Sequence, residues 1–329
     1  MENKLCISSR VRIARNIKGF PFRDMLAKSQ ALGIIDEVRG ALGNEYSYIN
    51  FSHLSQSKKN VYVEQHLVSH EFAVSERERA LFLSADRRIS VMIGEEDHIR
   101  IQAFAEGMNL QKALCEAQKV EDKLSEHIEF MFDERYGYIT KCPTNIGTGI
   151  RASVLMFLPT IMNRNHSRSV IGMLSGRGMT VRGLFGEGSS EFGALYQISN
   201  NVTLGVTEDE IIKNVEETVS ELEQAETTMQ RSLIEANPDF YTDDCMRALG
   251  ILGSAYIMSS SEACTLISKL MLGSTAGIIN CEKSSIQLYN ILMSLLPFTL
   301  TENFSNEIKS AEERDKYRAE YLRQLFKPK

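Results

Sequence analysis

Apolar and polar residues alternate along the chain with two different periods. In residues 7–13, Val11 and Ile13 alternate with Arg10 and Arg12, which is the two-residue period of a strand. In residues 29–42 the apolar positions are three or four residues apart, as on one face of a helix. On these criteria we expect strands over residues 7–13, 61–63, 88–93, 99–104 and 194–204, and helices over residues 29–42, 109–132 and 208–234.

The last part of the chain follows only the helical period. The triplet Asn237-Pro238-Asp239 interrupts a long acidic helix, because a proline ring cannot continue a helix interior. Beyond the triplet we expect helices over residues 242–259, 261–272, 284–295 and 306–325. We therefore predict two domains, residues 1–236 and residues 237–329, as the length of 329 residues also suggests.

Composition narrows the class of protein. Hydrophobic residues make up 43% of the chain and charged residues 24%, as in an ordinary globular protein. The net charge of -6 gives no bulk attraction to nucleic acid. The six cysteines include no C-x-x-C pair, which argues against zinc and disulfides and favours the reducing cytoplasm. Residues 1–16 do not resemble a signal peptide, and the longest apolar stretch, residues 152–162, is too short to span a membrane.

The stretch from Cys142 to Val154 has the pattern of a loop that leads into a buried element. Its two glycines let the backbone approach a ligand closely, and Arg151 stands just before an apolar run, where it could donate to a phosphate. A plain glycine-containing turn is the alternative. The string also fits the dinucleotide pattern G-x-G-x-x-A, but no acidic residue follows about 20 positions later.

Two further segments group residues with chemistry. If the two-residue period of Ile99 and Ile101 extends backwards, the opposite face carries Glu96, His98, Arg100 and Gln102. A solvated charged face is the alternative there. In residues 181–191, three glycines and two serines predict a mobile loop that carries Arg182 and Glu187.

These segments together resemble the signature motifs of the phosphagen (guanidino) kinases. In one of these motifs the family has an asparagine where this chain has Gly94, while the acids and the arginine of that motif are intact. The resemblance implies an α+β fold, with an antiparallel sheet flanked by helices and a helical C-terminal domain. The matching strings are S-S-R-V-R at residues 8–12, E-E-D-H-x-R at 95–100, the stretch at 142–154, R-G-x-x-G-E at 182–187 and Q-I-S-N-x-x-x-L-G at 197–205.

The resemblance also implies the cofactors and the binding residues. ATP would be the phosphoryl donor, and Mg²⁺ would be held mainly by its phosphates and by water, with no metal site in the protein. Phosphate-binding positions of the family are matched by Arg10, Arg12, Arg100, Arg151 and Arg182. Further nucleotide contacts are implied for Ser8, Ser9, Val11, His66, Ala152, Ser153, Val154, Leu155, Gly183, Leu184, Phe185, Gly186 and Glu187.

A guanidino acceptor needs a base, because its pKa above ~12 keeps it protonated and non-nucleophilic. We expect Glu96 to be that base rather than Glu95, because Glu96 shares the predicted face of Arg100. Glu187 would add a second carboxylate when its loop closes and excludes water. Cys142 would orient the guanidinium group and would not act as a nucleophile.

Near the C-terminus, residues 314–319 match R-D-x-x-R-A, a motif of the bacterial protein-arginine kinases within this superfamily. There the motif forms a phosphoarginine pocket, which implies that Arg318 binds phosphoryl oxygens while Asp315 accepts from guanidino nitrogens. An exposed helix with ordinary ion pairs is the alternative. The implied pocket residues are Arg314, Asp315, Lys316, Tyr317, Arg318 and Ala319.

The resemblance implies a function, namely phosphorylation of arginine side chains in proteins. Its implied partners are a heat-shock repressor and other protein substrates, a zinc-binding activator protein, the Clp ATPase and protease machinery, and a second copy of the chain. A kinase for free arginine is an alternative, disfavoured because only seven residues precede Ser8. A non-catalytic phosphoarginine-binding adaptor is another, disfavoured because Glu96, Glu187 and all five arginines are retained.

Overall fold

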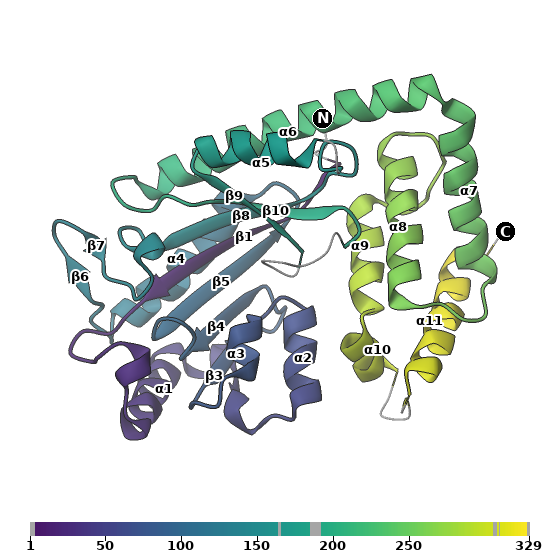
Figure 1. The fold of residues 1–329 in the computed structure, drawn as a ribbon. Helices are drawn as coiled ribbons and strands as arrows, with labels where there is room; N and C mark the ends of the chain where they lie inside the picture. Colours follow the sequence, from purple (N-terminus) through teal and green to yellow (C-terminus); the bar gives the residue numbers. More distant parts are fainter. Residues whose placement is uncertain (1–3, 164–165, 185–191, 305–307, 309, 328–329) are drawn as a thin grey trace.

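The computed structural model describes residues 4–163, 166–184, 192–304, 308 and 310–327. Its centre is an eight-stranded sheet in the order β2-β3-β4-β5-β1-β8-β10-β9, in which every neighbouring pair is antiparallel (Figure 1). The strands are β1 (Cys6–Arg15), β2 (Ser47–Asn50), β3 (Ala80–Leu83), β4 (Ile89–Ile93), β5 (Ile99–Glu106), β8 (Ile150–Phe157), β9 (Met179–Gly183) and β10 (Leu195–Asn200). A small hairpin pairs β6 (Phe132–Asp133) with β7 (Gly137–Tyr138).

One face of the sheet is apolar and is covered by helices. Val11 and Ile13 of β1 point to this face, together with Ile99 of β5 and Val154 of β8, and all four are fully buried. Apolar residues of the covering helices complete this core, which explains the helical period found in their sequences. The helices are α1 (Lys28–Leu42), α4 (Leu110–Ser125), α5 (Ser167–Gly176) and α6 (Glu208–Ala236).

The other face of the sheet is polar at its centre. Arg12 of β1 lies opposite Gln102 of β5 and Arg151 of β8. Because side chains alternate between the faces of a strand, this register sets the polar residues of adjacent strands side by side. Two short helices, α2 (Gln56–Glu64) and α3 (His70–Val74), flank this face at one end of the sheet.

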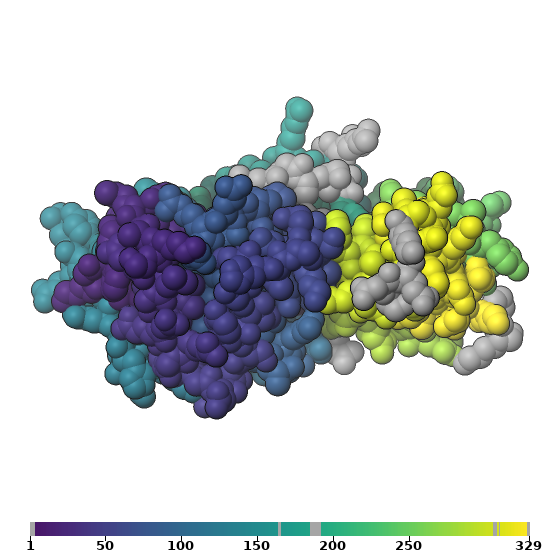
Figure 2. Space-filling model, turned by 90° about the horizontal axis from the view of Figure 1, so that it is seen from below, coloured from purple at the N-terminus to yellow at the C-terminus, as the bar shows by residue number. Residues whose placement is uncertain are grey.

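The C-terminal part is entirely helical in its described residues, which confirms the predicted α+β class. Its helices are α7 (Pro238–Ser254), α8 (Ser260–Thr275), α9 (Ser285–Ser294), α10 (Pro297–Asn303) and α11 (Ala311–Phe326). Their apolar residues form one cluster with Ile7, Leu155 and Phe157 of the sheet. Figure 2 shows the yellow C-terminal residues adjoining the purple and blue N-terminal residues. The helix break falls at Asn237, as expected, whereas the division into two domains stays a prediction.

Several predicted elements differ from the structure. Residues 61–63 belong to α2 and are not a strand, because Ser55 caps a helix there by accepting from the backbone N–H of Lys58. The helix predicted over residues 109–132 ends at Ser125, and residues 129–131 instead pair with residues 16–18. The strand predicted over residues 194–204 ends at Asn200. Helices α3, α5 and α10 and strands β2, β3, β6, β7 and β9 were not predicted, and β9 includes the first residues of the loop predicted over residues 181–191. In the described part of the chain, no helix combines the length and apolar content needed to cross a bilayer.

Candidate active site

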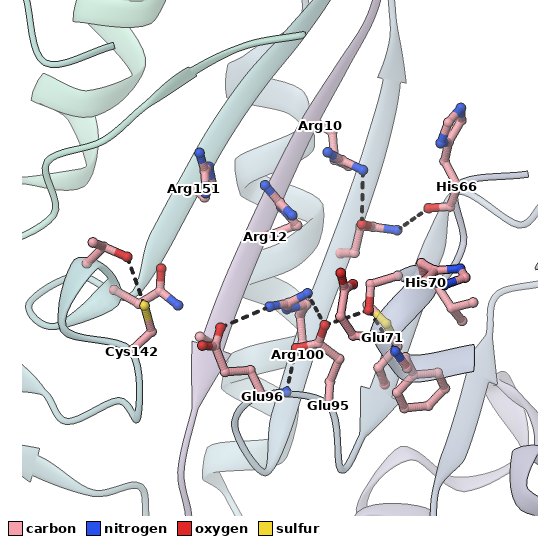
Figure 3. Close-up of a pocket in the computed structure, with 18 of the residues that line it drawn as sticks. Arg10, Arg12, His66, His70, Glu71, Glu95, Glu96, Arg100, Cys142 and Arg151 are labelled. Carbon is pink, nitrogen blue, oxygen red and sulfur yellow. Dashed lines mark hydrogen bonds and ion pairs between the residues drawn. The ribbon is translucent and has the colours of Figure 1, made fainter. Parts of the chain in front are cut away.

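A cavity of about 780 Å³ lies over the polar face of the sheet (Figure 3). Side chains from β1, β5, β8 and β9 form its floor, and residues around α2 and α3 form one wall. The opposite wall is the loop that carries Cys142, which enters β8 through Gly149. The sheet therefore supplies a rigid floor, while the walls come from loops and short helices.

Five arginines project into this cavity from four strands. In β10, Gln197 lies opposite Leu155 of β8 on one side and opposite Arg182 of β9 on the other. Because residues directly opposite each other point to the same face of a sheet, all five arginines share one face. Arg10 Nη1 lies 3.5 Å from Gln102 Oε1, and Arg151 Nε donates to Ser199 Oγ at 3.2 Å. The arginines are Arg10 and Arg12 of β1, Arg100 of β5, Arg151 of β8 and Arg182 of β9.

Burial and neighbouring like charges lower the pKa of two of these arginines, Arg10 and Arg12. Burial lowers the pKa of Arg10 to about 10, and the like charges of Arg100 and Arg151 add to that effect. Burial also lowers the pKa of Arg12, again with like charges contributing. Within the described residues, Nε of Arg10 and Nε of Arg12 are buried without an acceptor. A polyanion would supply both the missing negative charge and the missing acceptors, so the residues fit a nucleoside triphosphate.

Two carboxylates hold Arg100 at one end of the cavity. Glu95 is buried, and its Oε1 accepts from Arg100 Nη1 and from Ser69 Oγ, both at 2.6 Å. Glu96 Oε2 lies 3.6 Å from Arg100 Nη2, and the Glu96 side chain is 38% exposed. Burial raises the pKa of Glu96 against the opposing effect of Arg100. Glu95 is thus locked in place, whereas Glu96 is accessible and more basic than an ordinary glutamate.

Cys142 and His66 lie on different sides of the cavity (Figure 3). Cys142 Sγ lies 3.0 Å from Thr144 Oγ1, on the loop side. His66 lies on the α2 side, and its carbonyl accepts from Gln102 Nε2 at 2.8 Å. Burial, with a contribution from Arg10, lowers the pKa of His66 to about 3, so the ring is neutral near pH 7. His66 can therefore contact a ligand by hydrogen bonding or stacking, without adding charge.

Comparison with known proteins identifies the family. The model of the ATP:guanido phosphotransferase C-terminal catalytic domain matches residues 34–229, and that of the protein-arginine kinase McsB C-terminal domain matches residues 238–329. The chain belongs to the ATP:guanido phosphotransferase family. Relatives named protein-arginine kinase include one from Clostridium acetobutylicum, 38% identical over 98% of this chain and 96% of its own length. Another, from Clostridium kluyveri, is 37% identical over 97% of this chain and 94% of its own.

Solved structures of guanidino kinases share the fold. Lombricine kinase superposes with a TM-score of 0.63 at 21% identity, covering 70% of this chain and 69% of that one. The substrate-free duplicated taurocyamine kinase from Schistosoma mansoni gives a TM-score of 0.61 at 24% identity, covering 79% of this chain and 39% of that one. These similarities agree with the antiparallel sheet and flanking helices described above.

The family resemblance implied more nucleotide-binding residues than have side chains lining the cavity. Every second residue of a strand faces away from the site, and Val11, Ala152 and Val154 are buried in the opposite core. Ser9 Oγ is occupied there too, donating to Gly107 O at 2.7 Å. Ser8, Ser153, Leu155 and Gly183 do not line the cavity either, whereas Leu184 does. Phe185, Gly186 and Glu187 lie outside the described residues.

The argument that residues 94–98 extend strand β5 is wrong. β5 begins at Ile99, and the preceding residues form a turn in which Gly94 has a φ of 82°. A Cβ at Gly94 would lie 3.0 Å from Glu78 O, which explains why glycine suits this turn. His98 is buried and structural, since its Nδ1 accepts from the Ile17 N–H at 3.0 Å and its Nε2 donates to Pro21 O at 2.9 Å. Glu95 and Glu96 both reach Arg100, so the strand-face argument does not distinguish them.

The structure also adds residues that sequence reasoning missed. Ser69 positions Glu95, and it had no signal beyond being a helix-capping serine before α3. Lys141 lines the cavity next to Cys142, where adjacency in sequence could have indicated it. Arg23 and Glu71 also line the cavity, but they come from segments without a recognisable motif.

The C-terminal motif differs from its predicted geometry. Arg318 is only 1% exposed and donates through Nε to Leu295 O at 3.0 Å and through Nη1 to Met258 O at 2.7 Å. Its Nη1 also donates to Asp315 Oδ1 at 2.5 Å. Arg318 therefore ties α11 to the residues flanking α8 and α9. It is neither open to a phosphoryl group in this conformation nor part of an exposed ion pair, because packing of three helices encloses it.

Proposed function

We propose that this protein transfers a phosphoryl group from ATP to the guanidino group of arginine side chains in proteins. One observation carries the proposal: a group of five arginines ends at Arg100, which two carboxylates hold beside the loop of Cys142. Cationic groups suit the phosphates, and adjacent acidic groups suit a guanidinium acceptor. The full-length similarity to proteins named protein-arginine kinase supports an acceptor within a protein.

The residues of the cavity divide into three roles. The arginines neutralise and align phosphate oxygens, since phosphoryl transfer depends mainly on positioning and charge stabilisation. Glu96, with its raised pKa and partial exposure, accepts a proton from the acceptor guanidinium. Glu95 keeps Arg100 in place, and Cys142 orients the acceptor from the other wall. Glu187 remains the predicted source of a second carboxylate.

ATP, bound with Mg²⁺, would supply the phosphoryl group. Arg10 and Arg12 would hold its phosphates, because their buried Nε atoms are donors in need of acceptors. The described residues contain no group of three or more His, Cys, Asp or Glu side chains placed to hold a metal ion. Coordination of Mg²⁺ mainly by nucleotide phosphates and water stays a prediction.

The proposal extends to the setting in which the reaction is used. It includes a role in marking proteins for Clp-type proteolysis and in stress regulation through a heat-shock repressor, supported by the R-D-x-x-R-A string at residues 314–319 and by the similarity to proteins named protein-arginine kinase. For phosphoarginine to bind there, Arg318 would have to leave its contacts with Leu295 O and Met258 O. A zinc-binding activator, a cytoplasmic location and a homodimer belong to the same proposal. Sedimentation of the purified protein and Clp-dependent degradation of a phosphorylated casein-like protein would test these parts separately.

The transfer itself is tested by mass spectrometry of a casein-like protein incubated with enzyme and Mg-ATP. We expect a phosphoryl mass shift on arginine that mild acid removes, as a P–N bond requires. Glu96→Gln should fold and bind ATP but give no shift, because the amide cannot take the proton. Phosphorylation of free arginine alone would favour the metabolite-kinase alternative, and binding of phosphoarginine without ATP turnover would favour an adaptor.

A further inference from the structure

A second cavity, of about 470 Å³, lies next to the first. Its walls are the segment at residues 23–28, the first turns of α1 and the segment at residues 76–78. Its lining includes the apolar residues Leu26, Ala27, Ala31, Ile34 and Ile93. A cavity of this volume lies within the range of ligand-binding sites in proteins, so it has room for a large side chain.

Hydrogen bonds and ion pairs fix the walls of this second cavity to one another. Arg23 Nη2 donates to Ser75 Oγ at 2.6 Å, and Arg77 Nη1 donates to Arg23 O at 2.9 Å. Lys28 Nζ lies 2.6 Å from Glu78 Oε1. The two segments therefore meet in several places, so the cavity is a built feature of this part of the fold.

The two cavities are contiguous at the end where the acceptor should bind. Arg23 lines both of them, and Lys141 of the first cavity pairs with Asp24 of the second. Glu96 lies at this end of the first cavity, next to Arg100. Arg100 is opposite Ala14, which lies four residues along β1 from Arg10. In the described part of the chain, Nε of Arg23 is buried without an acceptor. It is a donor that a main-chain carbonyl passing between the cavities could satisfy.

We propose that the second cavity binds an apolar side chain of the substrate protein, close in sequence to the acceptor arginine. This inference rests on the proposed function. Three basic and three acidic residues line the cavity, so their charges balance, and the apolar lining residues favour an apolar occupant. An extended chain advances ~3.3 Å per residue, so the occupant lies within a few positions of the acceptor. The cavity has room for a large aliphatic or aromatic side chain. The balancing residues are Arg23, Lys28, Arg77, Asp24, Glu76 and Glu78.

The test compares peptides as acceptors for the full-length enzyme at saturating Mg-ATP. One peptide is acetyl-Gly-Arg-Gly-amide, and the others extend it with phenylalanine scanned through three positions on each side of the arginine. We expect one position to raise kcat/KM by about tenfold or more, as occupation of an apolar pocket does. Ala31→Trp should remove that preference by filling the cavity, and leave kcat/KM for the short peptide and the KM for ATP unchanged.

Two more variants make the result specific. Gly40→Trp adds the same side chain to α1 at an exposed position with nothing within 4 Å of its Cβ, and should keep the preference. Met25→Asp changes a cavity-lining residue that is 77% exposed, so the variant should fold normally, and it should weaken the preference. A wild-type enzyme with no preference, or one whose preference survives both Ala31→Trp and Met25→Asp, would overturn the inference alone. A wild-type enzyme that phosphorylates no arginine peptide or protein would overturn the proposed function as well.

Discussion

Replacing Arg15 by methionine probes the support behind the site. Arg15 is fully buried beneath the loop that leads to Arg151. Its Nε donates to Glu121 Oε1 of α4 at 2.6 Å, and its Nη1 donates to Thr148 O at 2.9 Å. Its guanidinium carbon also lies 3.4 Å from the ring centroid of Tyr138. One side chain thus connects β1, α4 and the loop, and it reaches no part of the cavity.

The expected loss of stability comes from the Glu121 carboxylate, which Arg15→Met leaves without its cation. Methionine retains most of the apolar volume of Arg15 but leaves the Glu121 carboxylate without its cation, a change that typically costs ~3–5 kcal/mol. The Glu121 side chain is 11% exposed, so water can solvate it in part and the lower end, about 3 kcal/mol, is expected. The double variant Arg15→Met with Glu121→Met should recover much of this loss, because no buried charge is then left unpaired.

The assay is urea unfolding followed by far-UV circular dichroism, since the chain contains no tryptophan. Arg247→Met is the matched control: its pair with Asp243 is exposed, so the free energy of unfolding should change by no more than about 1 kcal/mol. In the same variants we expect kcat to fall with Arg15→Met while the KM for ATP changes little. A loss of stability below about 1 kcal/mol in Arg15→Met, or a double variant no more stable than the single one, would refute the reasoning.

The site and the C-terminal helix give four further predictions. Arg151→Lys should lower kcat by ~10²–10³ without unfolding the protein, because lysine keeps the charge but not the bidentate fork; near-normal turnover would contradict this. Since burial raises the pKa of Glu96 above 4.5, the acidic limb of kcat/KM should lie above that pH. Lys141→Gln removes a cation that lowers this pKa, so the limb should move to higher pH, and an unmoved limb would argue against Glu96 as the base. Arg318→Ala should lower the free energy of unfolding, measured by thermal unfolding, by ~1–3 kcal/mol or more. The substitution leaves the carbonyl oxygens of Leu295 and Met258 without this donor.

The arginine cluster was the part of the site most accessible from sequence. Alternation placed Arg10 and Arg12 on the face opposite Val11 and Ile13, and the structure has them so. The family motif then brought in Arg151, which the register sets directly opposite Arg12. The same alternation explains why the Val11 side chain does not reach the cavity. A motif marks a string of residues, whereas the strand sends only every second one to the site.

The remaining features depended on contacts between distant segments. The turn at Gly94 ends the two-residue period, so His98 enters the core and bonds to residues 17 and 21. No spacing within residues 94–102 reveals those partners. Arg318 is similar, because its burial results from how α11 packs on the ends of α8 and α9. The second cavity joins segments about fifty residues apart, through Arg23 and Arg77, and neither segment has a motif.

The packing of the C-terminal helices bears on what the break at Asn237 separates. Burial raises the pKa of Tyr289 on α9, and Arg10 of the cavity is close enough to oppose that shift. Glu64 of α2 accepts from the backbone N–H of Phe298 and of Thr299 at the start of α10, two residues from His66 in its own chain segment. The apolar cluster beneath these contacts is built from both parts of the chain. Asn237 therefore divides the secondary structure, but one of the apolar clusters contains residues from both sides of it, and α9 and α10 lie close to the end of the cavity that carries Arg10 and His66.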